Sequence, residues 1–419
     1  MAMACTTERR SSSTTPTPNK WTDELPAELL ELIVKKLTWN FVDIIRFKAV
    51  CSSWNRAAIS YTSALYHTQL PPQYPWLKLF TQREQKYPWP SHDHHSRCFF
   101  SLADNNVYKM DWDASQGFGF YDRAVSLLGS SHGWLVVWEN KRLREYEIIH
   151  LFDPISTQCR TLPPLPCGSS ILRVALSSDP SRNNNFVVVV IYLTPQDIRV
   201  AFYQHGRGGD NAAAWTDFGG YPWHENSDIV FHNNGRLFAL WIDHSIQVWD
   251  FGDTCNDNNP TNIMNFQPSM DPNVIGGGSM TGDEQWLVES MGDLLLVGRE
   301  IFENDSRGAV EFYIYKLNIA AKTWEKVECL RDCALFLGRY QPAMLLSTQE
   351  LPRLKENSIY EWKLQKGCDD NFNIHVGVYN LETKLVEPYY TTQVPENASC
   401  SLPVWIAPSA FGPIREDCA

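Results

Sequence analysis

The 419-residue sequence lacks the features that mark membrane-spanning, disulfide-bonded and nucleic-acid-binding proteins. Its longest apolar run, residues 186–193, is far shorter than the ~20 residues that cross a bilayer. The eleven cysteines include no CxxC pair, which favours reduced thiols and a location in the nucleus, the cytoplasm or both. A net charge of −12 argues against nucleic acid as a partner, because no excess of Lys and Arg remains to neutralise phosphates.

Sequence motifs of common enzymes and metal sites are also missing. The chain contains no GxSxG, HExxH or GxxxxGK[ST] motif. The run His92-Asp93-His94-His95 suggests metal binding, but adjacent histidines cannot all converge on one ion, so we predict a surface loop. Cys329 and Cys333 have no neighbouring ligand set and are interpreted as small apolar residues. We therefore expect no catalytic residue, no metal and no cofactor.

The N-terminal part of the chain predicts a small helical domain at residues 21–60. Residues 1–20 are polar and are expected to be disordered. An apolar stripe with helical spacing follows, at Leu29, Leu30, Ile33, Val34 and Leu37. Two further short helices are expected around residues 41–50 and 53–60. A unit this small cannot bury all of its large apolar side chains, so some should form an exposed patch that binds a partner.

The order of these residues resembles the F-box. The pattern is Leu25-Pro26-x-x-Leu29-Leu30-x-x-Ile33-x-x-x-Leu37, then Ile44-x-Arg46-x-x-x-Val50-Cys51-x-x-Trp54. In that family this surface binds a Skp-type adaptor, which in turn binds a cullin. The resemblance implies the adaptor contacts Leu25, Pro26, Leu29, Ile33, Val50, Cys51 and Trp54. It assigns internal packing to Leu30, Val34, Leu37, Ile44 and Phe47. The pattern alone also fits a helical subdomain that packs on the rest of the chain.

The remainder of the chain predicts a large β domain at residues 99–410. Residues 61–98 are rich in proline and aromatic residues and are expected to be an irregular connector, and residues 411–419 a tail. Short β-type runs separated by turn residues form a loose repeat, which predicts a kelch-like β-propeller. Six blades are predicted at 99–130, 131–168, 169–220, 228–268, 284–330 and 333–390, with 401–409 closing the ring. Seven blades and a stacked β-sandwich are the alternatives.

Three stretches of the β domain carry a second resemblance. They are SHGWLVV with LFDPISTQCRTLPPLP, the pair DCALFLG and NSIYEW, and the terminal VWIAP. Together with the F-box they are similar to plant F-box proteins that carry a C-terminal KIB-type, kelch-related domain of unknown function. The resemblance implies a mainly β chain with a small α-helical N-terminal domain. It also implies that the propeller recruits a substrate.

Three functions are consistent with these observations. The first is a non-catalytic substrate-recognition subunit of an SCF-type E3 ubiquitin ligase, with a Skp-type adaptor, a cullin and an unknown target protein as partners. The second is an F-box-containing interaction protein that acts outside the ligase. The third is a propeller enzyme, which would place perturbed acidic groups and histidines in a central pocket. Strand tryptophans such as Trp241 and Trp249 could line a groove, but they are expected in the core between blades.

Overall fold

The computed structural model divides the chain into two compact units, Met1–Leu70 and Pro71–Ala419. It describes residues 25–37, 41–65, 73–84, 94–111, 125–139, 146–153, 158–166, 170–181, 183–206, 214–218, 227–232, 235–241, 243–251, 260–270, 284–290, 292–301, 310–338, 341–367, 371–396, 398–399 and 402–407. The segments predicted as disordered (1–20) and as a tail (411–419) lie outside these residues. No helix in the described part of the chain is both long and apolar enough to cross a membrane.

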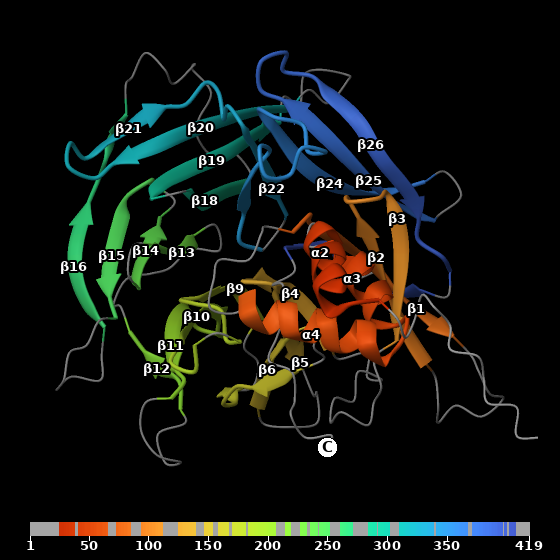
Figure 1. The fold of residues 1–419 in the computed structure, drawn as a ribbon. Coiled ribbons are helices and arrows are strands. Elements are labelled where there is room, and N and C mark those ends of the chain that lie inside the picture. The colour runs from red at the N-terminus through yellow and green to blue at the C-terminus, as the bar shows by residue number, and fades with distance from the viewer. Residues whose placement is uncertain are drawn as a thin grey trace, which may run out of the picture. The chain divides into compact units, whose positions relative to one another are not determined.

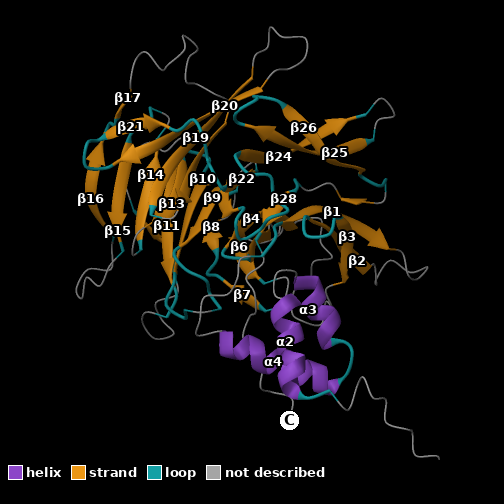
Figure 2. Cartoon of the chain, turned by 45° about the horizontal axis from the view of Figure 1, so that its top comes forward, coloured by secondary structure: helices purple, strands orange, loops and turns teal. Residues whose placement is uncertain are grey.

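The described residues of the first unit form three helices that pack against one another (Figure 2). They are α2 (Ala27–Leu37), α3 (Phe41–Lys48) and α4 (Ser52–Leu65). The carbonyl of Pro26 accepts the N–H groups of Leu29 and Leu30 and so opens α2. Glu28 in the first turn and Lys35 and Lys36 in the last complement the helix dipole. The expected helical domain is present, and α4 extends beyond the expected end at residue 60.

The second unit is a mainly antiparallel six-bladed β-propeller. Blade 1 contains β1 (Trp76–Glu84), β2 (His94–Ser101) and β3 (Asn106–Asp111). Blade 2 contains β4 (Val125–Ser131), β5 (Trp134–Glu139), β6 (Tyr146–Phe152), β7 (Cys159–Thr161) and β8 (Leu165–Pro166). Blade 3 contains β9 (Ser170–Leu176), β10 (Val187–Leu193), β11 (Ile198–Gln204) and β12 (Thr216–Asp217). Blade 4 contains β13 (Asp228–His232), β14 (Arg236–Leu240), β15 (Ile246–Asp250) and β16 (Thr261–Phe266). Blade 5 contains β17 (Ser269–Met270), β18 (Glu284–Ser290), β19 (Asp293–Ile301), β20 (Val310–Asn318) and β21 (Thr323–Lys326). Blade 6 contains β22 (Cys333–Leu337), β23 (Met344–Ser347), β24 (Ser358–Lys366), β25 (Phe372–Asn380) and β26 (Val386–Gln393). Figure 1 shows the sheets following one another around a ring. The six-bladed prediction is confirmed, and the alternatives of seven blades and a sandwich are wrong.

The ring closes through the C-terminal end of the described chain. β28 (Val404–Ile406) and β27 (Ala398–Ser399) both pair antiparallel with β1, so the last strands complete the first blade. This confirms that the segment at 401–409 closes the ring. Trp405 is fully buried there, and its indole Nε1 donates to the Leu337 carbonyl of blade 6 at 3.0 Å.

The first blade begins earlier in the sequence than expected. β1 and the start of β2 lie within residues 61–98, which differs from the expected irregular connector. His94 and His95 accordingly lie in a strand rather than in a loop, while His92 and Asp93 are outside the described residues. Residues 125–130, expected in blade 1, belong to β4, the first strand of blade 2. The proline and aromatic residues of the 61–98 stretch predicted an irregular connector, but Trp76, Leu77, Leu79 and Phe80 are buried side chains of β1.

Blade 6 departs from simple antiparallel order. β22 pairs in parallel with β24, from Ala334 opposite Ser358 to Leu337 opposite Glu361, and β23 pairs with the other side of β22. The two motifs DCALFLG and NSIYEW are therefore neighbouring strands of one sheet.

The apolar cores described for the propeller lie between blades. In β10, Val188 and Val190 pack toward blade 2, and Val189 and Ile191 pack toward blade 4. Because both faces are buried, this strand reads as a continuous apolar run rather than an alternating one. Trp249 also lies in the core between blades 3 and 4, and Trp241 is partly buried against the same core, as expected.

Candidate functional site

The helical unit exposes several large apolar side chains at the positions predicted to bind a partner. The exposed fraction is 47% for Leu29, 37% for Ile33 and 47% for Val50, and Pro26 is also exposed. Leu29 and Ile33 are four residues apart on α2, so they lie on one side of the helix. Large apolar groups left in solvent in this way are typical of a protein-binding surface.

One exposed apolar residue of this unit was not predicted. Leu32 is 59% exposed, more than any of the predicted contacts with a stated value. It lies three residues after Leu29, a spacing that places both side chains on adjacent parts of the same helix surface. That spacing was visible in the sequence, but Leu32 matches no position of the F-box pattern.

The other predicted contacts are partly buried and have a structural role. Trp54 packs against the helical core, with its ring centroid 4.5 Å from that of Phe47, and Leu25 packs against the same core. The Cys51 carbonyl accepts the N–H of Asn55 at 2.9 Å, which opens α4, and its Sγ lies 3.0 Å from Ser53 Oγ. These residues shape the ends of α2 and α4, and their contact with an adaptor stays a prediction.

The residues assigned to internal packing are buried or partly buried, and Leu30, Val34 and Phe47 belong to the core of the helical unit. Leu30, Val34, Ile44 and Phe47 are buried, and Leu37 packs against them while partly exposed. The assignment of these side chains is confirmed. The helical unit therefore has an apolar core that is separate from the exposed side chains of α2.

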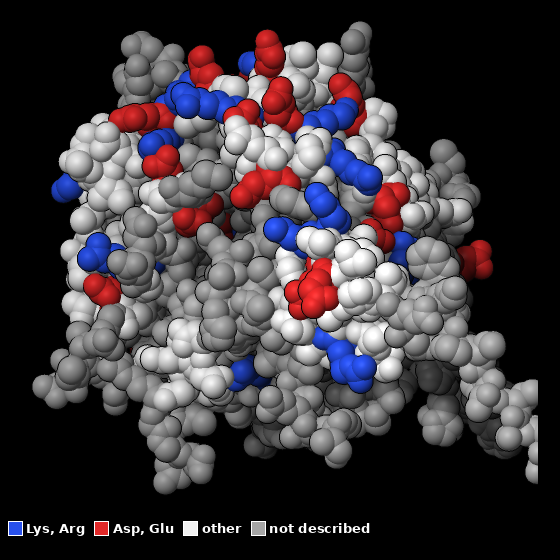
Figure 3. Space-filling view, viewed as in Figure 1, with Lys and Arg blue, Asp and Glu red and all other residues white. Residues whose placement is uncertain are grey.

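Lys and Arg are not separated from Asp and Glu on the face of the molecule that Figure 3 shows. Figure 3 shows Lys and Arg interspersed with Asp and Glu on the visible face, including close pairs. In the helical unit, Arg46 Nη1 lies 3.1 Å from Asp43 Oδ1. The face seen in Figure 3 thus shows no extended basic patch of the kind that nucleic acid requires.

On the propeller, Arg160 of β7 holds the loop that follows β9. Its guanidinium donates to the Pro180 carbonyl at 3.0 Å and to Asn184 Oδ1 at 3.2 Å, and it lies 5.8 Å from the ring centroid of Phe186. It also lies 3.2 Å from Nε2 of His205. Because Arg160 can only donate, Nε2 accepts and His205 is neutral. Burial, and then the Arg160 charge, lower the pKa of His205.

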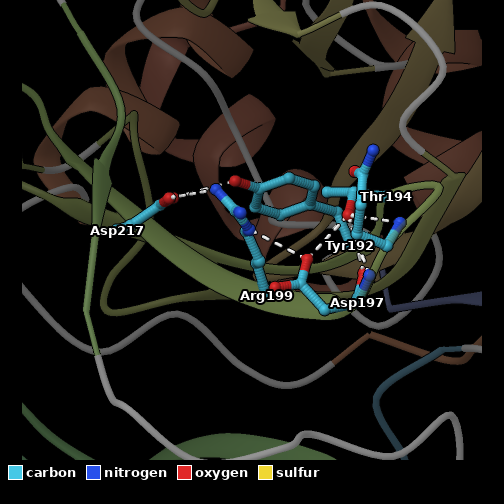
Figure 4. Close-up of polar contacts among 6 residues, drawn as sticks. Tyr192, Thr194, Asp197, Arg199 and Asp217 are labelled. Atoms are coloured by element: carbon cyan, nitrogen blue, oxygen red, sulfur yellow. Dashed lines mark hydrogen bonds and ion pairs between the residues drawn. The ribbon is translucent and has the colours of Figure 1, made fainter.

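A second polar cluster joins the β10–β11 hairpin to β12 (Figure 4). The Tyr192 hydroxyl donates to Asp217 at 2.8 Å, and Arg199 lies 2.9 Å from Asp197 and 3.4 Å from Asp217. The Thr194 hydroxyl donates to Asp197 at 2.7 Å. Burial, and then Asp217, raise the pKa of Tyr192, while the Thr194 hydrogen bond and then Arg199 lower the pKa of Asp197. Each group thus stabilises a neighbour, and the cluster fixes a hairpin.

Acid–histidine pairs elsewhere also join strands. His150 of β6 lies 3.2 Å from Glu139 of β5, and its other ring nitrogen lies 3.2 Å from the Thr161 hydroxyl of β7. Within the described residues, no group of three or more His, Cys, Asp or Glu side chains is placed to hold a metal ion. Cys329 and Cys333 are free thiols in this part of the chain. Burial raises the pKa of Cys333, which disfavours the reactive thiolate.

Comparisons with known proteins point to one family. A family model described as the KIB1-4 β-propeller matches residues 99–380. The F-box protein SKIP23 of Arabidopsis thaliana is 23% identical over 388 residues, covering 80% of this chain and 82% of the relative. The F-box/kelch-repeat protein KIB1 of the same plant is 22% identical over 363 residues, covering 82% and 81%. A solved β-propeller domain of a trilobed protease from Pyrococcus furiosus covers 77% of this chain and 93% of its own, at 8% identity and a TM-score of 0.33, which is too remote to support an argument.

Proposed function

The chain belongs to the KIB1-4 β-propeller family, and on that premise we propose that it is the substrate-recognition subunit of an SCF-type E3 ubiquitin ligase. The helical unit binds a Skp-type adaptor, and through it a cullin, by Leu25, Pro26, Leu29, Ile33, Val50, Cys51 and Trp54. The propeller binds a target protein. F-box names among the relatives support this proposal.

One observation carries the proposal: the apolar surface of Leu29, Ile33 and Val50 is exposed although the helical unit has its own core. Burying an aliphatic side chain of this size contributes about 1.5–3 kcal/mol. A partner that covers these exposed apolar side chains would therefore gain a substantial part of its binding free energy from them. The positions coincide with those that the F-box pattern assigns to the adaptor.

The proposed mechanism is proximity rather than chemistry on this chain. The adaptor and cullin hold the ubiquitin-conjugating enzyme, and the propeller holds the target beside it. Tethering raises the effective concentration of the target lysine to about the millimolar range. Orientation lowers the barrier further. No catalytic residue, metal or cofactor of this chain takes part in the proposal.

Reconstitution of the full chain with a recombinant Skp-type adaptor and cullin tests the proposal. We expect the three proteins to elute as one complex from a gel-filtration column. A complex with adaptor that excludes cullin would support the alternative of an interaction protein outside the ligase. Elution of the chain apart from the adaptor would contradict the proposed role in the ligase. A fluorescent fusion is expected in the nucleus, the cytoplasm or both, and a membrane-bound signal would contradict that location.

A further inference from the structure

The side chains of α2 are distributed unevenly around the helix axis. Successive residues of an α-helix are rotated by about 100°. Relative to Leu29, this rotation places Ile33 at about 40°, and the buried Leu30 and Val34 at about 100° and 140°. On the other side of Leu29 it places Leu32 at about −60°. The apolar arc therefore spans about 200°, roughly twice the stripe that a surface helix needs for its own core.

Three of the four charged residues of α2 lie outside this apolar arc. Glu28, Glu31 and Lys35 fall within one sector of about 60°, centred near 230°. The exception is Lys36, which lies at about −20°, between Leu29 and Leu32 in projection and one turn further along the helix. Lys36 is exposed, so a cation sits at one end of an otherwise apolar surface.

We propose that Leu32 and Lys36 form an extension of the adaptor-binding surface and select an adaptor with an apolar hollow for Leu32 and a carboxylate opposite Lys36. This inference rests on the proposed function and adds the chemistry of the partner. Leu32 lies next to Leu29 on α2, so one continuous interface that covers Leu29 and Ile33 can also include Leu32. A carboxylate opposite Lys36 supplies charge complementarity, because a cation buried without a counter-charge would oppose binding.

Two residues of the same helix make matched comparisons possible. Lys35 and Lys36 are adjacent, carry the same charge and are both exposed, but point about 100° apart. Replacing either by Gln removes one positive charge and retains a good helix former. Only Lys36→Gln removes a charge from the proposed surface. Leu32→Gln likewise keeps helix propensity, and the 59% exposure of Leu32 means that the folded core is not disturbed.

The test is the affinity of the full chain for a recombinant Skp-type adaptor, measured by calorimetry at low and high salt. We expect Leu32→Gln to weaken binding at least tenfold at both salt concentrations. Lys36→Gln should weaken it threefold to tenfold at low salt and flatten the salt dependence, while Lys35→Gln stays within twofold of the wild type. Equal losses of adaptor affinity in Lys35→Gln and Lys36→Gln would overturn the inference. So would an affinity of the Leu32→Gln variant within twofold of the wild type.

The outcomes also separate this inference from the proposed function. Adaptor binding that is lost on changing Leu29 and Ile33 but not Leu32 leaves the proposed function intact and removes only the extension. Hydrogen exchange on the chain without adaptor tests whether the chain's own propeller, rather than an adaptor, covers the surface around Leu32. If Leu32→Gln raises exchange in propeller strands, the surface is covered by the chain's own propeller, and the inference is overturned.

Discussion

Arg173 of β9 and Asp228 of β13 form an ion pair between neighbouring blades, with Nε and Oδ1 3.4 Å apart. Both side chains are buried. The second carboxylate oxygen of Asp228 accepts the backbone N–H of Leu287 at 2.8 Å, which lies in β18 of the next blade. One carboxylate therefore joins blades 3, 4 and 5 through β9, β13 and β18.

Removal of this carboxylate should destabilise the propeller. Asp228→Ala removes the carboxylate that pairs with the buried Arg173 guanidinium and accepts the Leu287 N–H, and we expect the free energy of unfolding to fall by about 3–5 kcal/mol. Asp293→Ala breaks a half-exposed pair with Lys316 and should cost less than about 1 kcal/mol. Urea unfolding monitored by tryptophan fluorescence measures both. Similar losses for the two variants would show that the buried pair has no special role.

The closure of the ring gives a second prediction. Trp405 is fully buried, its backbone N–H donates to Gln341 Oε1 at 3.1 Å, and its backbone carbonyl accepts from the Ser130 hydroxyl. Trp405→Ala should lower the free energy of unfolding by about 3–5 kcal/mol. Limited proteolysis should then cleave blade 1 first, because β28 and β1 separate. Leu402→Ala changes an exposed residue of the same segment and is expected to leave the cleavage pattern unchanged.

Stability should depend on pH through His205. Its folded-state pKa lies below the ordinary value of 6.5, because it is partly buried and faces the Arg160 guanidinium. The folded state then binds fewer protons than the unfolded state below pH 6.5, so stability is lost as the pH falls through that window. Urea unfolding between about pH 7 and pH 5 measures this loss.

His205→Gln is the matched variant for the pH measurement, since a Gln amide oxygen can still accept from Arg160. It should flatten part of the pH dependence. Some pH dependence of stability should persist in this variant, because burial also lowers the pKa of His244. Parallel pH profiles for the wild type and the variant would contradict the assignment.

Much of the propeller could be predicted from the sequence, because its strands are short apolar runs bounded by turn residues. The blades at 169–220 and 228–268 match the sheets that begin at Ser170 and Asp228. The start of blade 1 was placed too late, because the proline and aromatic residues around β1 are also typical of an irregular connector. The parallel pairing of β22 with β24 could not be predicted, because strand order depends on contacts that a local pattern does not contain.

The candidate site was only partly predictable for a different reason. Helical spacing identifies the apolar residues of α2, and the F-box pattern divides them into core and surface. Neither shows that Trp54 is half-covered by its contact with Phe47, or that Leu32 remains exposed. Such differences depend on how three helices pack, and a short unit leaves that packing open to many arrangements.

The most direct test of the central proposal is the affinity of the adaptor for a chain with Leu29→Gln and Ile33→Gln. Both side chains are exposed, so the helical core should persist, as circular dichroism can verify. We expect the pair to cost about 2–4 kcal/mol of binding free energy, or ~30-fold to ~1,000-fold in Kd. The control Leu385→Gln alters a 65% exposed propeller residue and should leave Kd unchanged. An adaptor affinity equal to that of the wild type in the double variant would contradict the account.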